Sequence, residues 1–276
     1  MLKNMLFRKN VWLVTVLAFS SVSVAQQRKT QQDAMIEAGS HSEATATCDV
    51  TFSSGTGTNA TKFCVTVNGN IAQFSVAGGE MIDVGGVGEG YGICDLTDSS
   101  EYYDYAYLDS GNFAGPTFTH SGNVVTVTRE TNDSRWLLKQ TITNVPATAV
   151  GPGSVKVSMA LKNLTSQSRA AYLLRYADVD ADGDETGNDF DFTAQTAFGL
   201  EPNSNRGLSS TNNTFNEDFG QDTFAQKANA GPHPCNPFVY YAPQPFHGDG
   251  AIVQFWSLPA GGHNSTHTVV STYKPI

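Results

Sequence analysis

Apolar and polar residues alternate in short runs through most of the chain, and Gly, Asn, Pro and Ser separate the runs. The segment 154–162 is the clearest case, because Val155, Val157, Met159 and Leu161 would share one face of a strand while polar residues and one alanine occupy the other. This pattern predicts a strand that packs on one side and meets solvent on the other. Helical periodicity is nearly absent.

A β-hairpin is expected where Phe63–Val67 and Ile71–Val76 flank Asn68-Gly69, since this dipeptide supplies the positive φ angles of a type I′ turn. Further strands are expected at residues 124–129, 136–142, 154–162, 171–176, 190–193, 195–200, 238–242, 251–258 and 267–273. Ten or more short strands with mainly tight connections predict an all-β fold with little helix. We expect a two-sheet antiparallel β-sandwich that forms one domain over residues 46–276.

Two segments interrupt the strand pattern. The stretch Glu201–Pro237 is rich in Asn, Ser, Asp, Gly and Pro and is expected to form a long loop, with a short helix at Phe215–Ala230. The glycine-rich Gly85–Gly92 does not match a dinucleotide-binding motif and is expected to be a turn.

The N-terminus has the features of a secretory signal peptide. Positive residues lie at Lys3, Arg8 and Lys9, an apolar run follows, and the small residues Ser23-Val24-Ala25 suit cleavage after Ala25. We expect residues 1–25 to be removed, residues 26–45 to form a flexible arm, and the product to be secreted, extracellular or periplasmic, without a membrane anchor.

Removal of the signal peptide takes three positive charges and no negative ones, which moves the formal net charge from −10 to −13. An acidic chain without a basic stripe is poorly suited to nucleic acid or to an anionic membrane surface. The four cysteines of an exported chain favour two disulfides. Three pairings are possible, and we expect Cys48 with Cys64 on neighbouring strands and Cys94 with Cys235.

The strongest chemical motif is the segment Asp178–Asp189, which reads DVDADGDETGND. Oxygen-bearing side chains at positions 1, 3, 5 and 12, with Gly at position 6, match the spacing by which a twelve-residue loop wraps Ca²⁺. The segment resembles the loops of EF-hands and dockerins, although strands instead of helices are expected on both sides and Asp replaces the usual Glu at position 12. The residues expected to bind calcium are Asp178, Asp180, Asp182, Asp184 and Asp189. The alternative is a solvated acidic turn.

A tyrosine-rich segment, Glu101–Tyr107, is the second candidate site. Aromatic faces beside a carboxylate can bind glycans, so the candidate ligand-binding residues are Tyr102, Tyr103, Asp104, Tyr105 and Tyr107. Buried core tyrosines are the alternative. Trp136 and Trp256 are expected in the core.

Most catalytic motifs are missing from the sequence, including the GxSxG elbow and HExxH. Glycosidases need only two suitably spaced carboxylates, and Glu89, Asp95, Glu101 or Asp104 could supply them. The leading hypothesis is a non-catalytic, calcium-stabilised β-sandwich that binds a glycan or another cell-surface component. The alternatives are a carbohydrate-active enzyme of the glycoside hydrolase or lyase type and a purely structural extracellular protein.

Overall fold

The computed structural model describes residues 46–84, 87–214, 216, 218–227 and 231–276. The expected signal peptide and N-terminal arm lie outside the described residues. Within them, no helix has the length and apolar character needed to cross a membrane.

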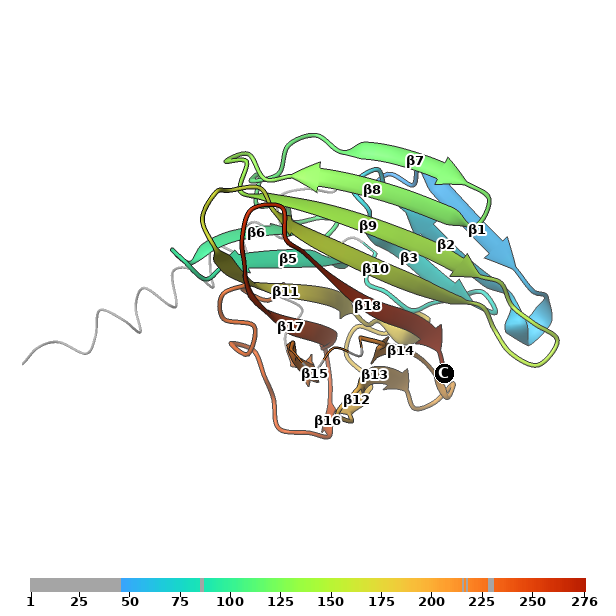
Figure 1. Cartoon of the computed structure of the whole chain (residues 1–276). Coiled ribbons are helices and arrows are strands. Elements are labelled where there is room, and N and C mark those ends of the chain that lie inside the picture. The colour runs from blue at the N-terminus through green and yellow to red at the C-terminus, as the bar shows by residue number, and fades with distance from the viewer. Residues whose placement is uncertain (1–45, 85–86, 215, 217, 228–230) are drawn as a thin grey trace, which may run out of the picture.

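The described chain is an all-β sandwich, as the sequence predicts, built from three antiparallel sheets (Figure 1). The first contains β1 (Val50–Ser54), β2 (Thr61–Val65), β3 (Ile71–Val76) and β4 (Gly79–Glu80), with the 3-10 helix η1 (Gly57–Asn59) between β1 and β2. The second has the order β16 (Phe246–His247), β12 (Asp189–Phe192), β13 (Thr196–Glu201), β14 (Arg206–Asn212), β18 (Thr266–Pro275), β10 (Ser154–Asn163), β9 (Trp136–Val145), β8 (Val124–Glu130) and β7 (Thr117–Ser121). The third has the order β15 (Gly220–Gln226), β17 (Ala251–Gly261), β11 (Arg169–Asp178), β5 (Glu89–Asp95) and β6 (Ser100–Asp104), and the 3-10 helix η2 (Ala181–Gly183) follows β11.

One face of the nine-stranded sheet packs against both smaller sheets. The main core joins Val157 and Met159 of β10 to Phe74 of β3 and to Ile93 of β5, and all four are fully buried. On β10 the alternate residues from Val155 to Leu161 are buried, which confirms the predicted one-sided strand. The four-stranded sheet was not anticipated, and it covers the end of the large sheet that the five-stranded sheet leaves free (Figure 1).

The five-stranded sheet is buried on both faces. Leu173 and Trp256 face the main core, whereas Leu174, Tyr176 and Phe224 belong to a second apolar cluster on the opposite side. A strand that is covered on both faces loses the alternation of apolar and polar residues. For this reason β11 reads as a nearly continuous apolar run.

The two expected disulfides are present, Cys48 with Cys64 and Cys94 with Cys235. The second joins β5 to a segment 141 residues further along the chain, which ties two distant parts of the chain together. Trp136 and Trp256 are buried in the core, as expected.

Three sequence-based expectations about secondary structure are wrong. The segment 201–237 is not one long loop, because β14 and β15 lie within it, and β15 occupies residues 220–226 where a helix was expected. Residues 238–242, expected as a strand, form turns. The glycine-rich turn is also shorter than expected, since β5 begins at Glu89. Within this strand, position 90 requires glycine, because a Cβ there would lie 1.9 Å from the carbonyl oxygen of Asp104.

Candidate metal centre

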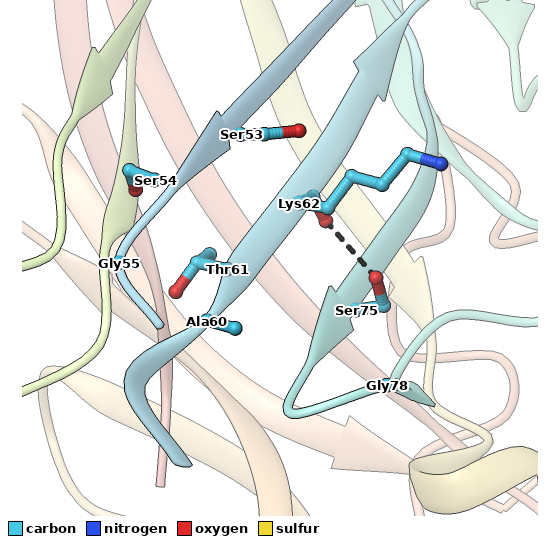
Figure 2. Close-up of a pocket in the computed structure, with 8 residues that line it drawn as sticks. All are labelled: Ser53, Ser54, Gly55, Ala60, Thr61, Lys62, Ser75 and Gly78. Carbon is cyan, nitrogen blue, oxygen red and sulfur yellow. Dashed lines mark hydrogen bonds between the residues drawn. The ribbon is translucent and has the colours of Figure 1, made fainter. Parts of the chain in front are cut away.

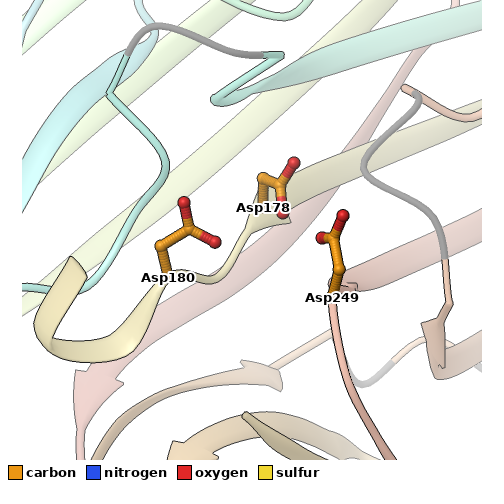
Figure 3. Close-up of side chains that lie close together, drawn as sticks. All are labelled: Asp178, Asp180 and Asp249. Carbon is orange, nitrogen blue, oxygen red and sulfur yellow. The ribbon is translucent and has the colours of Figure 1, made fainter. Parts of the chain in front are cut away.

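Three aspartates meet at one end of the five-stranded sheet. Asp178 is the last residue of β11, Asp180 follows two residues later, and Asp249 precedes β17. Since Asp178 lies opposite Ala251 in the antiparallel pairing of β11 with β17, the end of one strand meets the start of the other. One carboxylate oxygen from each aspartate lies within 4.8 Å of the other two (Figure 3). We refer to Asp178, Asp180 and Asp249 as the acidic cluster.

The carboxylate of Asp178 is incompletely satisfied. The residue is fully buried, and its Oδ2 accepts a hydrogen bond from the Tyr176 hydroxyl at 3.3 Å. Its Oδ1 has no hydrogen-bond partner among the described residues. A buried carboxylate oxygen without a partner is costly, because burial removes its hydration and nothing in the protein replaces it.

The electrostatic environment makes the charged form of each aspartate unfavourable. Burial, followed by Asp180, Asp83 and Asp249, holds the pKa of Asp178 well above its usual range. Burial and neighbouring carboxylates raise the pKa of Asp180 to about 7 and that of Asp249 to about 6. For all three, the strongest charged neighbours are carboxylates. A bound cation would reverse this balance, since it would compensate the negative charges and supply a partner for the free oxygen.

The donor atoms in the cluster suit a hard cation. Calcium binds carboxylate oxygens, accepts irregular geometry and completes its shell with backbone carbonyls or water. The cluster combines two buried aspartates, Asp178 and Asp180, with the half-buried Asp249. Two of these three were expected from the sequence.

The other expected calcium ligands lie elsewhere. Asp182 adopts a left-handed φ of 59° and pairs with Arg206 at 3.0 Å. Asp184 accepts hydrogen bonds from the backbone N–H groups of Thr186 and Gly187, which closes an exposed turn. Asp189 lies on β12, where its carboxylate contacts the His247 ring at 2.8 Å. The loop therefore does not gather all five aspartates around one point.

Sequence reasoning missed Asp249 as a candidate ligand. It lies 71 positions beyond Asp178 in the sequence, so no local spacing rule could connect the two. The only local signal is its place in the segment Gly248-Asp249-Gly250, directly before a strand.

The tyrosine segment does not form a single exposed row. Strand β6 ends at Asp104, and Ala106 turns the chain with a φ of 65°. Tyr102 and Tyr105 are buried, whereas Tyr103 and Tyr107 are half-buried. The carboxylate of Asp104 is buried against Arg129 at 2.6 Å.

Tyr105 is a core residue with a satisfied hydroxyl group. Its OH donates to the carbonyl oxygen of Pro232 at 2.6 Å, and its ring stacks on that of Tyr103 with centroids 5.2 Å apart. The Tyr102 hydroxyl donates to Asp133 at 2.6 Å and lines a cleft at the edge of the five-stranded sheet. We call this the edge cleft, and it is lined by Ser100, Glu101, Tyr102, Asn112, Asn132 and Asp133.

Three of the four carboxylates considered for catalysis lie in interior ion pairs. Glu89 is fully buried against Arg175, and its Oε2 accepts from Arg175 at 2.8 Å. Asp95 pairs with Arg169 at 2.5 Å. Asp104 pairs with Arg129, as described above. Glu101 differs, because it is half-exposed and contacts His233 at 3.3 Å and no arginine among the described residues.

A second hollow lies on the four-stranded sheet (Figure 2). Ser53, Lys62 and Ser75 form a row across β1, β2 and β3, since Lys62 lies opposite both serines in the strand pairing. The hydroxyls of Ser54 and Thr61 are engaged, because they accept hydrogen bonds from the N–H groups of Ala147 and Gly153. The hollow has a volume of about 520 Å³, and among the described residues that line it Lys62 carries the single charge.

No protein-family model matches the sequence, and none of the curated proteins matches it either. Among solved structures, a bacterial glucoamylase in complex with acarbose is similar with a TM-score of 0.53 and 8% identity, over 84% of this chain and 32% of the glucoamylase. A protein from Synechocystis sp. PCC 6803 has a TM-score of 0.49 and 9% identity, over 82% and 95% of the two chains. A heparan sulfate lyase mutant from Pedobacter heparinus has a TM-score of 0.44 and 10% identity, over 84% and 35%.

The chain spans about a third of the length of the glucoamylase. At this level of identity, the likeness to the glucoamylase shows a shared fold.

Proposed function

We propose that this protein is a secreted, non-catalytic β-sandwich that binds calcium at the acidic cluster and a carbohydrate at its surface. The observation that carries the calcium proposal is the Oδ1 atom of Asp178, which is fully buried, has no partner among the described residues and lies beside Asp180 and Asp249. A cation bound there would connect the end of β11 to the start of β17 and stabilise the folded state.

Calcium is favoured over magnesium because the cluster offers several carboxylate oxygens, which come from three residues. Magnesium requires nearly ideal octahedral geometry and gives up its water reluctantly. Isothermal titration calorimetry with CaCl₂ and MgCl₂ tests this choice. We expect a dissociation constant of ~0.1 to 1 mM for calcium, the range of extracellular modules, and weaker binding of magnesium. Equal affinities, or no heat with either ion, would contradict the proposal.

The carbohydrate part of the proposal is supported by the fold that the chain shares with a glucoamylase solved with acarbose. A glycan array read in calcium and in chelator tests this part. Binding without release of reducing sugar is the expected result.

A carbohydrate-active enzyme is the second candidate, and one observation favours it. Glu101 and Asp133 both line the edge cleft, and pairs of carboxylates perform glycoside hydrolysis. Release of reducing sugar that Glu101→Gln abolishes would replace the non-catalytic proposal with this one.

A further inference from the structure

The edge cleft lies beside β6, the last strand of the five-stranded sheet. Loop residues 112 and 132–133 form its other wall, and its volume is about 300 Å³. This size is at the lower limit of ligand sites, which occupy ~300 to 1,000 Å³. The cleft therefore has room for the end of a ligand rather than for a long chain.

Hydrogen bonds hold the two carboxylates of the cleft in place before any ligand arrives. Asp133 accepts from the hydroxyls of Tyr102 at 2.6 Å and Thr131 at 2.7 Å, and it pairs with Arg135 at 3.1 Å. Glu101 accepts from the backbone N–H of Cys235 at 2.8 Å, and Cys235 is itself tied to β5 by its disulfide. Side chains that are fixed in this way lose little conformational entropy when they bind a ligand.

The two amides of the cleft are fixed through their nitrogen atoms. Asn112 donates its Nδ2 to the carbonyl oxygen of Glu101 at 3.0 Å, and Asn132 donates its Nδ2 to that of Gly111 at 2.8 Å. Both amide oxygens remain without a donor among the described residues, as do lone pairs on Glu101. Each oxygen of Asp133, in contrast, already has two partners. The lining is therefore rich in acceptors and acidic, since Glu101 contacts no arginine among the described residues and Asp133 shares Arg135 with Asp98.

A ligand for such a lining must donate several hydrogen bonds and must not be an anion. The hydroxyl groups of a neutral sugar satisfy both conditions, whereas a uronic acid or a sulfated sugar would place its charge beside Glu101, which no arginine among the described residues compensates. We infer that the edge cleft is the carbohydrate-binding site and that it takes the terminal unit of a neutral saccharide. This inference rests on the proposed function, because it takes the partner to be a carbohydrate.

The experiment compares neutral and uronate-containing oligosaccharides on a glycan array, followed by calorimetry with the best neutral binder. The variants Glu101→Gln and Asn112→Ala change the cleft, and Asn112 is exposed, so its replacement does not open the core. Glu130→Gln is the matched control, since Glu130 lies on β8 and does not line the cleft. Melting curves confirm that each variant is folded.

We expect wild type and Glu130→Gln to bind neutral saccharides equally. Glu101→Gln should weaken binding at least about tenfold, since a hydrogen bond to a charged group contributes ~1.5 kcal/mol or more. Ligand addition should also shift the side-chain amide NMR signals of Asn112 and Asn132.

Three results would overturn the inference. If wild type binds a saccharide and both cleft variants bind it equally well, the cleft is not the site, although carbohydrate binding itself stands. If uronates bind best and Lys62→Met removes that binding, the site is the hollow on the four-stranded sheet. If no saccharide binds at all, the carbohydrate part of the proposed function fails, and the cleft inference fails with it.

Discussion

The substitution Asp249→Asn separates two descriptions of the calcium site. The sequence places the ligands within the loop 178–189, whereas the structure groups Asp178 and Asp180 with Asp249 and turns Asp184 outward into a hydrogen-bonded turn. If the acidic cluster holds the ion, Asp249→Asn removes most of the calcium effect and Asp184→Asn leaves it intact. If the loop holds the ion, Asp184→Asn removes most of the calcium effect and Asp249→Asn leaves it intact.

The size of the effect follows from binding linkage. A ligand that binds only the folded state at a hundred times its dissociation constant stabilises that state by ~2.7 kcal/mol. For a domain of 150 to 250 residues, each kcal/mol shifts the melting temperature by about 2 to 4 °C, so calcium should raise the wild-type value by about 5 to 10 °C. Asp249→Asn should reduce this shift to about 2 °C or less. Without calcium, it should melt at the wild-type temperature or higher, because one repelling charge is removed.

The assay is thermal unfolding, followed by circular dichroism, in ~10 mM calcium and in chelator. This calcium concentration is ~100 times a dissociation constant of ~0.1 mM. Asp184→Asn is the control for the loss of one acidic charge from the same region. Identical melting curves for wild type in calcium and in chelator would refute the metal centre. A calcium shift that survives in Asp249→Asn but disappears in Asp184→Asn would restore the contiguous loop.

Three further predictions concern the charges and packing of the domain. In chelator, the protein should lose stability as the pH rises from about 4 to 7. The pKa of Asp180 is raised to about 7 in the folded state, so over that range the folded protein binds more protons than the unfolded one. Calcium should reverse this trend above pH 6. Urea unfolding at several pH values measures both effects, and a gain in stability from about pH 4 to 7 in chelator would contradict the raised carboxyl pKa. Arg175→Met should destabilise the fold by about 3 to 5 kcal/mol, because it leaves Glu89 buried without its partner, and adding Glu89→Gln should recover part of the loss. A double-mutant cycle in urea without measurable coupling would show that the pair does not act as a unit. Tyr105→Ala should cost about 3 to 5 kcal/mol because the ring is buried, whereas Tyr103→Ala should cost clearly less. Equal costs in urea unfolding would show that both tyrosines belong to the core.

Several features could be predicted from the sequence because they depend on local patterns. The alternation in 154–162 defines a strand and its buried face, and the expected hairpin pairs β2 with β3. The predicted turn type is wrong, because β2 ends at Val65 and Gly69 has a positive φ of 88° whereas Asn68 does not, so the turn is not type I′. The disulfides Cys48–Cys64 and Cys94–Cys235 also agree with the sequence-based expectation. A pattern of a few residues determines the strand and the hairpin, and only three pairings are possible for four cysteines.

The strands β14 and β15 could not be predicted, because their sequences are mostly polar. Segment 206–212 gains its strand geometry from β13 and β18 on either side of it, and segment 220–226 gains its geometry from β17. Backbone hydrogen bonds to a neighbouring strand do not depend on the side chains, so composition alone carries little signal for such strands.

Which residues form the candidate sites also depends on contacts between strands that are distant in the sequence. Local spacing identified Asp178 and Asp180, but only the pairing of β11 with β17 brings Asp249 beside them. A run of tyrosines could belong to a surface or to a core, and the second apolar cluster on the five-stranded sheet decides that Tyr105 is buried. Sequence periodicity fixes which residues share a face of one strand, whereas burial and site assembly depend on which other strands cover that face.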